Sequence, residues 1–368
     1  MNILIVKLSA IGDVLHTLPA LCAIRACYPR ARITWVVETA AADLVKGHRA
    51  LDRVIVFRRK EWIRQLASSH LKKGNIKAVA AEFLQFCRDL RDTRYDMVID
   101  FQGLLKSSIP VVLAKSRRKI GFGRGMQHQE GSYLFLNERI APVDMEIHAL
   151  ERGLILLSAI GISTDAIVYD VPVTDADQQA VNDLLVEAGI HGSRPLVAIN
   201  PVALWETKLW KNDRFADLAD RLVKEDNVDV VFTGGPDDRP VIADIISKMK
   251  SPAANLAGKT RLPMLAALYQ KSRLLVTTDT GPMHLAAAMD TPVVALFGPT
   301  APWRTGPFGK GHYILRTGIS CSPCFKRDCI YHHHHCMEAI SVQEVGVAVG
   351  SALKDAVDRI ICPVFKNR

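Results

Sequence analysis

Short apolar runs alternate with longer amphipathic stretches along the first half of the chain. The apolar runs cover residues 2–7, 33–37, 54–57 and 97–101, and each has the length of a β-strand. The stretch 13–27, between the first two runs, has the composition of an apolar helix. Because a strand buried on both faces of a parallel sheet consists almost entirely of apolar residues, this alternation predicts a β/α domain.

The same pattern begins again after a linker near Pro172. Four strand-like runs follow, at residues 196–200, 228–233, 274–277 and 293–297, and most are separated by helical stretches. We therefore predict an α/β fold in which two Rossmann-like parallel-sheet domains face a central cleft. In sheets of this kind, ligands bind at the carboxyl ends of the strands.

The expected domain bounds follow from this repeat. The first domain is predicted to cover residues 1–170 and the second residues 175–344. A final helix, 345–362, comes after the second sheet is complete, and we expect it to pack back on the first domain. Two basic stretches of the first domain, 58–77 and 116–130, are predicted to be a mobile insertion and a glycine-rich loop.

The stretch 274–300 has the pattern of a strand, a polar turn, a helix and a second strand. Asp279 and Thr280 are residue types that cap helices, and Gly281 lets a ligand approach the backbone closely. Pro282 is tolerated in a first helical turn. The unpaired amides and positive dipole end of such a helix suit a phosphate, although an ordinary capped helix also explains the turn by itself.

Length and composition are those of a globular protein. A chain of 368 residues, of which 49% are hydrophobic, can bury a core in each of two domains. No apolar run approaches the roughly 18 residues of a membrane-spanning helix, and the run 3–6 is too short for a secretory signal. We therefore expect a cytoplasmic protein.

Positive charge is concentrated in the first third of the chain. The formal net charge is +9, and residues 1–130 contain 23 Lys and Arg against 11 Asp and Glu, whereas the remainder contains 24 against 27. This excess suits an acidic substrate or an anionic membrane surface, and the absence of a nucleic-acid motif argues against nucleic acid. No Gly-x-Gly-x-x-Gly follows the first strand and no Walker A motif is present, which argues against a nicotinamide enzyme or a P-loop NTPase.

Polar residues near the ends of predicted strands are candidate catalytic or ligand-binding residues. Asp13 lies where the first strand meets its helix, as either a helix cap or a general base that faces the cleft. Lys208 lies in the loop after a strand of the second domain, as either a solvated lysine or a point charge for a diphosphate. Gly234 and Asp237 follow the next strand, where an acidic side chain can accept ribose hydroxyls.

Four cysteines cluster late in the sequence beside a run of histidines. They are Cys321, Cys324, Cys329 and Cys336. Cys and His in a short polar segment resemble a structural zinc site, but the spacing matches no standard finger. The alternative is a set of reduced structural thiols.

Four motifs in order give the chain a specific resemblance. They are ILIVKLSAIGDVLHTLPAL, DFQGLLKSS, a loop that ends in KLW, and TDTGPMHLAAA with ALFGPT. Together these resemble the bacterial lipopolysaccharide heptosyltransferases of glycosyltransferase family 9, most of all heptosyltransferase I. The resemblance implies the GT-B arrangement of two Rossmann-like domains, and transfer of heptose from ADP-L-glycero-D-manno-heptose to the Kdo/heptose inner core of lipid A, with inversion and without a required cofactor.

The resemblance also implies residue roles. Asp13 matches the catalytic base, and Lys208 matches the phosphate-binding lysine. The donor diphosphate is expected at the turn that comprises Asp279, Thr280, Gly281, Pro282, Met283 and His284. A sugar-nucleotide epimerase, or another non-transferring protein with the same two-domain fold, is the alternative.

The acceptor, an anionic lipid A core, is expected to bind the first domain. Lys7 and His16 flank Asp13, and basic side chains supply the remaining contacts. We assign to them Arg59, Arg64, Arg117, Arg118 and Arg124. The protein is accordingly expected to make peripheral contact with the cytoplasmic face of the inner membrane.

Overall fold

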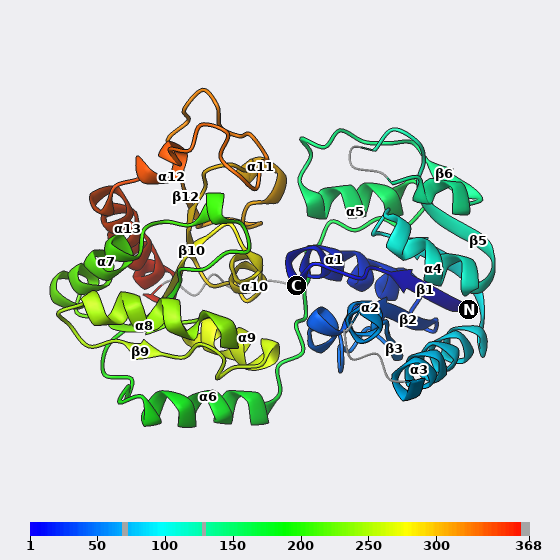
Figure 1. Ribbon diagram of the computed structural model, residues 1–368, viewed down its shortest axis with the longest axis horizontal. Coiled ribbons are helices and arrows are strands. Elements are labelled where there is room, and N and C mark those ends of the chain that lie inside the picture. The colour runs from blue at the N-terminus through cyan, green and yellow to red at the C-terminus, as the bar shows by residue number, and fades with distance from the viewer. Residues whose placement is uncertain (68–72, 127–129, 362–368) are drawn as a thin grey trace. The chain divides into compact units, whose positions relative to one another are not determined.

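The chain divides into two compact units. The computed structural model describes residues 1–67, 73–126 and 130–361 (Figure 1). The first unit is Met1–Pro172 and the second is Val173–Arg368. Each unit contains one six-stranded sheet in which every pair of neighbouring strands is parallel. Within the described ranges, no helix is long and apolar enough to cross a membrane.

The first sheet has the strand order β3-β2-β1-β4-β5-β6. Its strands are β1 (Asn2–Val6), β2 (Arg32–Val37), β3 (Arg53–Val56), β4 (Arg94–Asp100), β5 (Lys115–Phe122) and β6 (Glu138–Ile140). The helices of this unit are α1 (Ile11–Cys27), α2 (Arg59–Ala67), α3 (Lys73–Arg91), α4 (Leu105–Leu113) and α5 (Ala149–Ser158), with short 3₁₀ helices η1 (Thr39–Leu44) and η2 (Ser132–Phe135).

The central strands of the first sheet form the middle of its hydrophobic core. Ile3, Leu4, Ile5 and Val6 of β1 are completely buried, as the apolar run predicted. Val6 pairs in register with Asp100, so the carboxyl ends of β1 and β4 lie side by side. The strand order reverses between these two strands, which makes their ends the ligand-binding position of a doubly wound sheet.

The second sheet repeats this design in the order β12-β11-β10-β7-β8-β9. Its strands are β7 (Leu196–Asn200), β8 (Asp229–Phe232), β9 (Ala254–Asn255), β10 (Leu274–Thr278), β11 (Val293–Leu296) and β12 (Tyr313–Leu315). The helices are α6 (Asp175–Glu187), α7 (Asn212–Glu225), α8 (Arg239–Lys248), α9 (Leu262–Lys271), α10 (Gly281–Ala288), α11 (Pro302–Thr305), α12 (His335–Glu338) and α13 (Val342–Ile361), with η3 (Glu206–Lys208) and η4 (Pro236–Asp238). The order reverses between β7 and β10.

The last helix packs on the second sheet, and its expected contact with the first domain stays a prediction. Val345, Val349 and Ala352 of α13 are buried in the apolar core that α7 and β10 also form. The helix begins three residues earlier than predicted, at Val342, and residue 362 lies outside the described residues. The apolar stripe of α13 is thus used inside the second unit.

Both basic stretches of the first domain contain regular structure. The predicted insertion forms α2 and the start of α3, and Trp62 docks α2 by packing edge-on against Phe57 and Phe86 while its indole N–H donates to Glu82 (2.8 Å). Residues 68–72 and 127–129 lie outside the described residues. Much of the predicted glycine-rich loop is the strand β5. Its outward side chains are polar, so the sequence of β5 has no apolar run that would predict a strand.

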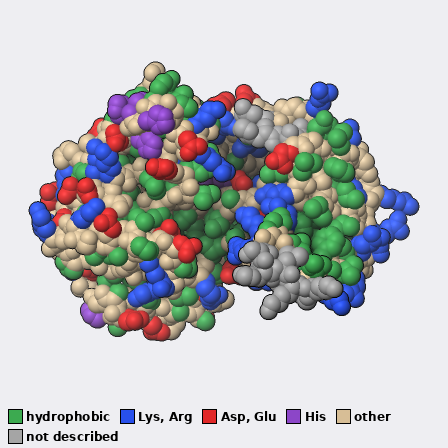
Figure 2. All heavy atoms as spheres, in the orientation of Figure 1, with side chains coloured by type: hydrophobic (Ala, Val, Ile, Leu, Met, Phe, Trp, Pro, Cys, Tyr) green, Lys and Arg blue, Asp and Glu red, His purple; other side chains and the backbone are tan. Residues whose placement is uncertain are grey.

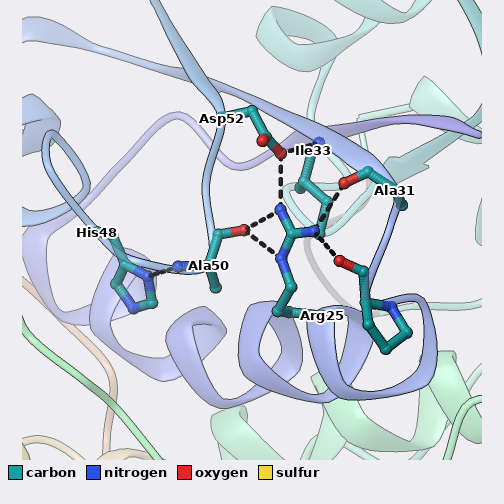
Figure 3. Close-up of polar contacts among 7 residues, drawn as sticks. Arg25, Ala31, Ile33, His48, Ala50 and Asp52 are labelled. Atoms are coloured by element: carbon teal, nitrogen blue, oxygen red, sulfur yellow. Dashed lines mark hydrogen bonds and ion pairs between the residues drawn. The ribbon is translucent and has the colours of Figure 1, made fainter.

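Arg25 fastens the carboxyl-terminal end of α1 to the neighbouring strands (Figure 3). Its guanidinium donates to the carbonyl oxygens of Ala31 (2.7 Å) and Ala50 (3.0 Å) and to the carboxylate of Asp52 (2.6 Å). Asp52 in turn accepts the amide N–H of Ile33 at the start of β2 (2.7 Å). This network holds α1, and with it the first turn of that helix, in a defined place against the sheet.

Candidate active site

A pocket of about 280 Å³ opens at the carboxyl ends of β1 and β4 in the first unit. Its lining includes Lys7, Asp13 and His16 from the first predicted motif, and Asp100 and Gln102 from the second. The first unit therefore gathers two motifs that are almost ninety residues apart in sequence at one ligand-binding position.

Asp13 occupies the first turn of α1 at the edge of this pocket. Its carboxylate accepts the amide N–H of Ala10 at 3.0 Å, and its backbone carbonyl accepts the hydroxyl of Thr17. A helix amino terminus is a favourable place for a negative charge. The residue is half-buried, so one carboxylate oxygen is anchored to the loop while the side chain still borders the pocket.

Lys7 and His16 flank Asp13 as expected. The ammonium group of Lys7 donates to the carbonyl of Phe101 at 3.1 Å, which directs this lysine along the end of β4. His16 is buried and packs edge-on against the ring of His148, with 5.1 Å between the ring centroids. Both residues line the same pocket as the aspartate.

Asp100 and Gln102 organise the loop that leads to Asp13, a role that the sequence analysis did not assign. The side-chain oxygen of Gln102 accepts the amide N–H groups of Leu8 and Ser9, both at 3.0 Å. Asp100 accepts the amide of Gln102 (2.9 Å) and the hydroxyl of Ser107 (2.9 Å). Burial raises the pKa of Asp100, and these hydrogen bonds oppose that rise. The motif DFQGLLKSS was the available signal.

Lys106 is a second residue that was not assigned from the sequence. It is partly buried at the start of α4 and donates to the hydroxyl of Ser9. Burial lowers the pKa of Lys106, while the nearby carboxylates of Glu38 and Asp13 oppose that effect. Glu38 is itself buried and pairs with Arg59 (3.3 Å). Arg59 is thus the predicted acceptor arginine that lies in this charged cluster.

The other predicted acceptor arginines are more dispersed. Arg124 is exposed on the segment that follows β5 and precedes Met126, a pocket residue. Arg64 is exposed on α2. Arg117 and Arg118 lie in the amino-terminal half of β5, and Arg118 pairs with Glu138 at 2.8 Å. Because the pocket is at the other end of that strand, the structure does not bring these two residues to it.

In the second unit, the strand ends at the reversal point hold a buried charge pair. The ammonium group of Lys208 lies 2.7 Å from the carboxylate of Asp279, which also accepts the hydroxyl of Thr300 at 2.6 Å. Lys208 additionally contacts the face of Trp205, at 4.6 Å from the ring centroid. The loop after β7 and the turn after β10 are therefore joined through the two residues that were predicted to bind phosphate.

The predicted phosphate turn forms the start of α10. Thr280 is the residue before the first helical turn, and Gly281 and Pro282 begin the helix. Met283 is completely buried and His284 nearly so, which leaves the backbone of the turn as the part of this motif available to a ligand. The sequence analysis expected a helix after this turn, with Pro282 tolerated in its first turn, and the helix begins at Gly281.

The loop after β8 contains the remaining predicted donor residues. Gly234 follows Thr233 at the strand end, and Asp237 is exposed within η4. Asn200, which was not assigned from the sequence, ends β7 and is buried; its amide donates to the carbonyl of Thr233 at 2.9 Å. This bond ties two strand ends together beneath the loops.

The cysteine segment lies close to the loop that contains Lys208. Cys321, Cys324, Cys329 and Cys336 are all free thiols and line one small pocket. The hydroxyl of Thr207 donates to the carbonyl of Lys326 at 2.9 Å, which fastens this segment to the residue before Lys208. Across the described part of the chain, no group of three or more His, Cys, Asp or Glu is arranged to hold a metal ion.

Comparisons with known proteins agree with this architecture. The family model for glycosyltransferase family 9 (heptosyltransferase) matches residues 83–335. The chain is 31% identical to lipopolysaccharide heptosyltransferase 1 of Pseudomonas aeruginosa, over 90% of this chain and 88% of that protein. It is 28% identical to lipopolysaccharide heptosyltransferase 1 of Escherichia coli, over 86% of this chain and 93% of that protein.

Solved structures show the same fold. The structure of E. coli heptosyltransferase WaaC with ADP matches with a TM-score of 0.76 at 24% identity, covering 96% of this chain and 100% of that chain. E. coli ADP-heptose lps heptosyltransferase II matches with a TM-score of 0.75 at 22% identity, covering 96% and 99%. The α/β fold class with two Rossmann-like parallel sheets, of the GT-B type, is thereby confirmed.

Proposed function

The chain belongs to glycosyltransferase family 9, the heptosyltransferases, and on this basis we propose that it transfers heptose from ADP-L-glycero-D-manno-heptose to the Kdo/heptose inner core of lipid A. It is an enzyme of lipopolysaccharide biosynthesis. The observation that supports the proposed chemistry most directly is the position of Asp13 in the pocket of the first unit, between Lys7 and His16. The epimerase alternative is not retained, because the family is one of glycosyltransferases.

Asp13 is the proposed general base. It removes the proton of an acceptor hydroxyl, whose oxygen attacks the anomeric carbon of heptose as the bond to ADP breaks, which inverts the configuration. One carboxylate oxygen is held by the amide of Ala10, which orients the group for this role. Gln102 positions the same loop through its bonds to Leu8 and Ser9.

The second unit is proposed to bind ADP-heptose. The structure of WaaC, a similar protein, was solved with ADP. In this chain, Lys208 and the backbone amides at the start of α10 supply positive charge for a leaving diphosphate, at the carboxyl ends of β7 and β10. We propose that Asp279 orients Lys208 and that Gly234 and Asp237 border the nucleoside.

The acceptor is proposed to bind the basic cluster of the first unit. Kdo sugars and lipid A phosphates are anionic, and Lys7, Lys106 and Arg59 lie at or beside the pocket of Asp13. Because such an acceptor is a lipid, we also propose that the enzyme is cytoplasmic and contacts the cytoplasmic face of the inner membrane peripherally. The reaction chemistry needs no cofactor.

Transfer assays with purified protein test this proposal. With ADP-heptose as donor, we expect release of ADP only when a Kdo-lipid A acceptor is present, together with one added heptose on the acceptor. A panel of truncated cores identifies the accepted sugar, and we expect the heptose-free core to be used, as the similarity to heptosyltransferase 1 indicates. Conversion of ADP-heptose without any acceptor would contradict the proposal.

A structural zinc ion is proposed for the cysteine segment. The four thiols already line one pocket, and amide N–H groups of the histidine run lower the pKa of Cys329, which favours the thiolate that zinc requires. Small movements of this loop have to bring the ligands into a tetrahedron, because the described geometry is not one. Metal analysis of tag-free protein should find near-stoichiometric zinc that is lost in a Cys324→Ser/Cys329→Ser variant. Metal-free protein that is folded would show that the segment needs no ion.

A further inference from the structure

Helix α4 has an apolar stripe on its outward side. Leu105, Ile109 and Val112 are 50%, 38% and 49% exposed, and their spacing puts them on one side of the helix. The buried side contains Ser107, Ser108, Pro110 and Val111, so it combines polar and apolar residues. A helix that covers a sheet normally turns polar residues outward, and the exposed apolar stripe of α4 is additional to the side that packs inside the unit.

The neighbouring segment η2 extends this stripe. It contacts α4, and its residues Leu134 and Phe135 are 63% and 44% exposed. We call the five side chains Leu105, Ile109, Val112, Leu134 and Phe135 the α4–η2 surface. In Figure 2, hydrophobic side chains gather on the first unit in the region of α3 and α4, and Lys and Arg side chains surround them. Contiguous exposed apolar groups with a polar rim are typical of a docking surface.

The rim of the α4–η2 surface is mainly basic. The ammonium group of Lys119 donates to the carbonyl of Val112 at 3.2 Å, and Arg139 donates to the carbonyls of Tyr133 and Leu136 beside η2. Lys115 and Arg117 are exposed directly after α4. Two acidic residues are also present: Glu130 accepts the amide of Leu105, and Glu138 is neutralised by Arg118.

We propose that the α4–η2 surface docks the enzyme on an anionic lipid bilayer, with the apolar stripe at the acyl boundary and the basic rim at the headgroups. Apolar side chains framed by Lys and Arg match the composition of interfacial membrane-binding elements. This inference rests on the proposed function, which gives the enzyme a lipid-linked acceptor.

The path of α4 connects this surface to the reaction pocket. Leu104 lines the pocket and the next residue, Leu105, begins the exposed stripe. In the same first turn, Lys106 bonds to Ser9 and Ser107 bonds to Asp100. A lipid-linked acceptor whose sugar enters the pocket can therefore keep its acyl chains beside α4, within a membrane that the stripe contacts.

Vesicle sedimentation of the purified enzyme tests the proposal. We expect it to sediment with vesicles of phosphatidylglycerol and phosphatidylethanolamine but weakly with pure phosphatidylcholine. The variant Ile109→Gln/Val112→Gln/Leu134→Gln should lower binding to the anionic vesicles at least tenfold, without a change in net charge. Its matched control is Val186→Gln/Val347→Gln on α6 and α13, whose side chains are 57% and 56% exposed, and we expect the control to bind like the unaltered enzyme.

Two further measurements separate the explanations. Transfer to a water-soluble, deacylated acceptor should be equal in the triple variant and the unaltered enzyme, which also shows that the variant is folded. If the unaltered enzyme transferred no heptose to this acceptor, the result would count against the proposed function and not against the docking surface. Equal vesicle binding by the triple variant and the unaltered enzyme would overturn the docking proposal. The proposal would also be overturned if analytical sedimentation found the unaltered enzyme to be a dimer and the triple variant a monomer, with equal binding to vesicles. The α4–η2 surface would then contact a second copy of the chain.

Discussion

Asp13 is held by its position in the first turn of α1 and by one hydrogen bond from the backbone amide of Ala10. An asparagine side chain can keep both. The variant Asp13→Asn keeps an oxygen that accepts the amide of Ala10, but it cannot take the acceptor proton. We expect transfer to fall about 100-fold or more, the usual contribution of a positioned base. Thermal stability and ADP-heptose affinity should hardly change, since the proposed donor residues belong to the other unit. Normal transfer by Asp13→Asn would refute the assignment of Asp13 as the base. Failure of this variant to fold would indicate that Asp13 is instead needed as a helix cap.

Lys208 is the residue-scale test of the donor site. Its ammonium group is mostly buried against Asp279 and Trp205, so the charge is held in place before any ligand arrives. Lys208→Ala should weaken ADP-heptose binding roughly ten- to a hundredfold, because a charge-assisted contact to phosphate contributes about 1.5–3 kcal/mol. Calorimetric titration with ADP-heptose measures this loss.

The matched control for Lys208 is Lys211. It lies three residues further along and pairs with Glu338 on a largely exposed side chain. Lys211→Ala should leave the affinity for ADP-heptose unchanged. Equal affinities for both variants and the unaltered enzyme would return Lys208 to the role of a structural partner of Asp279.

At the scale of elements, Arg25 decides how firmly α1 is attached to its sheet. The side chain donates to the carbonyl groups of Pro29, Ala31 and Ala50, and it neutralises Asp52. Arg25→Met removes the donor to these carbonyl groups and the positive charge beside Asp52, which should lower the free energy of unfolding by about 2–3 kcal/mol. Urea denaturation followed by circular dichroism measures the change.

Arg49 is the control for this element-scale prediction. Its ion pair with Asp170 is on the surface, and 84% of the Arg49 side chain is exposed. Arg49→Met should therefore have little or no measurable effect on unfolding. If both variants unfold at the same urea concentration as the unaltered protein, the network in Figure 3 does not stabilise α1.

The hydrophobic pattern of the sequence did not predict the elements that have many outward-facing polar residues. β5 contains Lys115, Arg117 and Arg118, so it has no apolar run, and only its carboxyl-terminal half is buried. α2 is strongly basic and is recognisable only once Trp62 is seen to dock it. The pattern of α13 leaves a related question open, because an amphipathic helix encodes an apolar face but not the partner of that face, which includes the second sheet.

At the scale of the whole molecule, the chain repeats one arrangement twice. In each sheet the strand order reverses beside the first strand, and the candidate residues lie at or after the carboxyl ends of the two strands at that point. They are Asp13 and Asp100 in the first unit, and Lys208 and Asp279 in the second. The same topology thus provides one ligand-binding position in each unit, which we propose for an anionic acceptor in the first unit and for a diphosphate in the second.

The sequence by itself determined the two β/α units and their central strands, and it singled out Asp13, Lys208 and the turn at Thr280 as candidate site residues. These features are local, because a buried parallel strand is an apolar run and a helix start has its own residue types. Only the tertiary structure decided which distant residues meet. Gln102 reaches the loop before Asp13, Lys106 reaches Ser9, and Asp279 pairs with Lys208. Such contacts depend on strand order and register, which no single stretch of residues encodes.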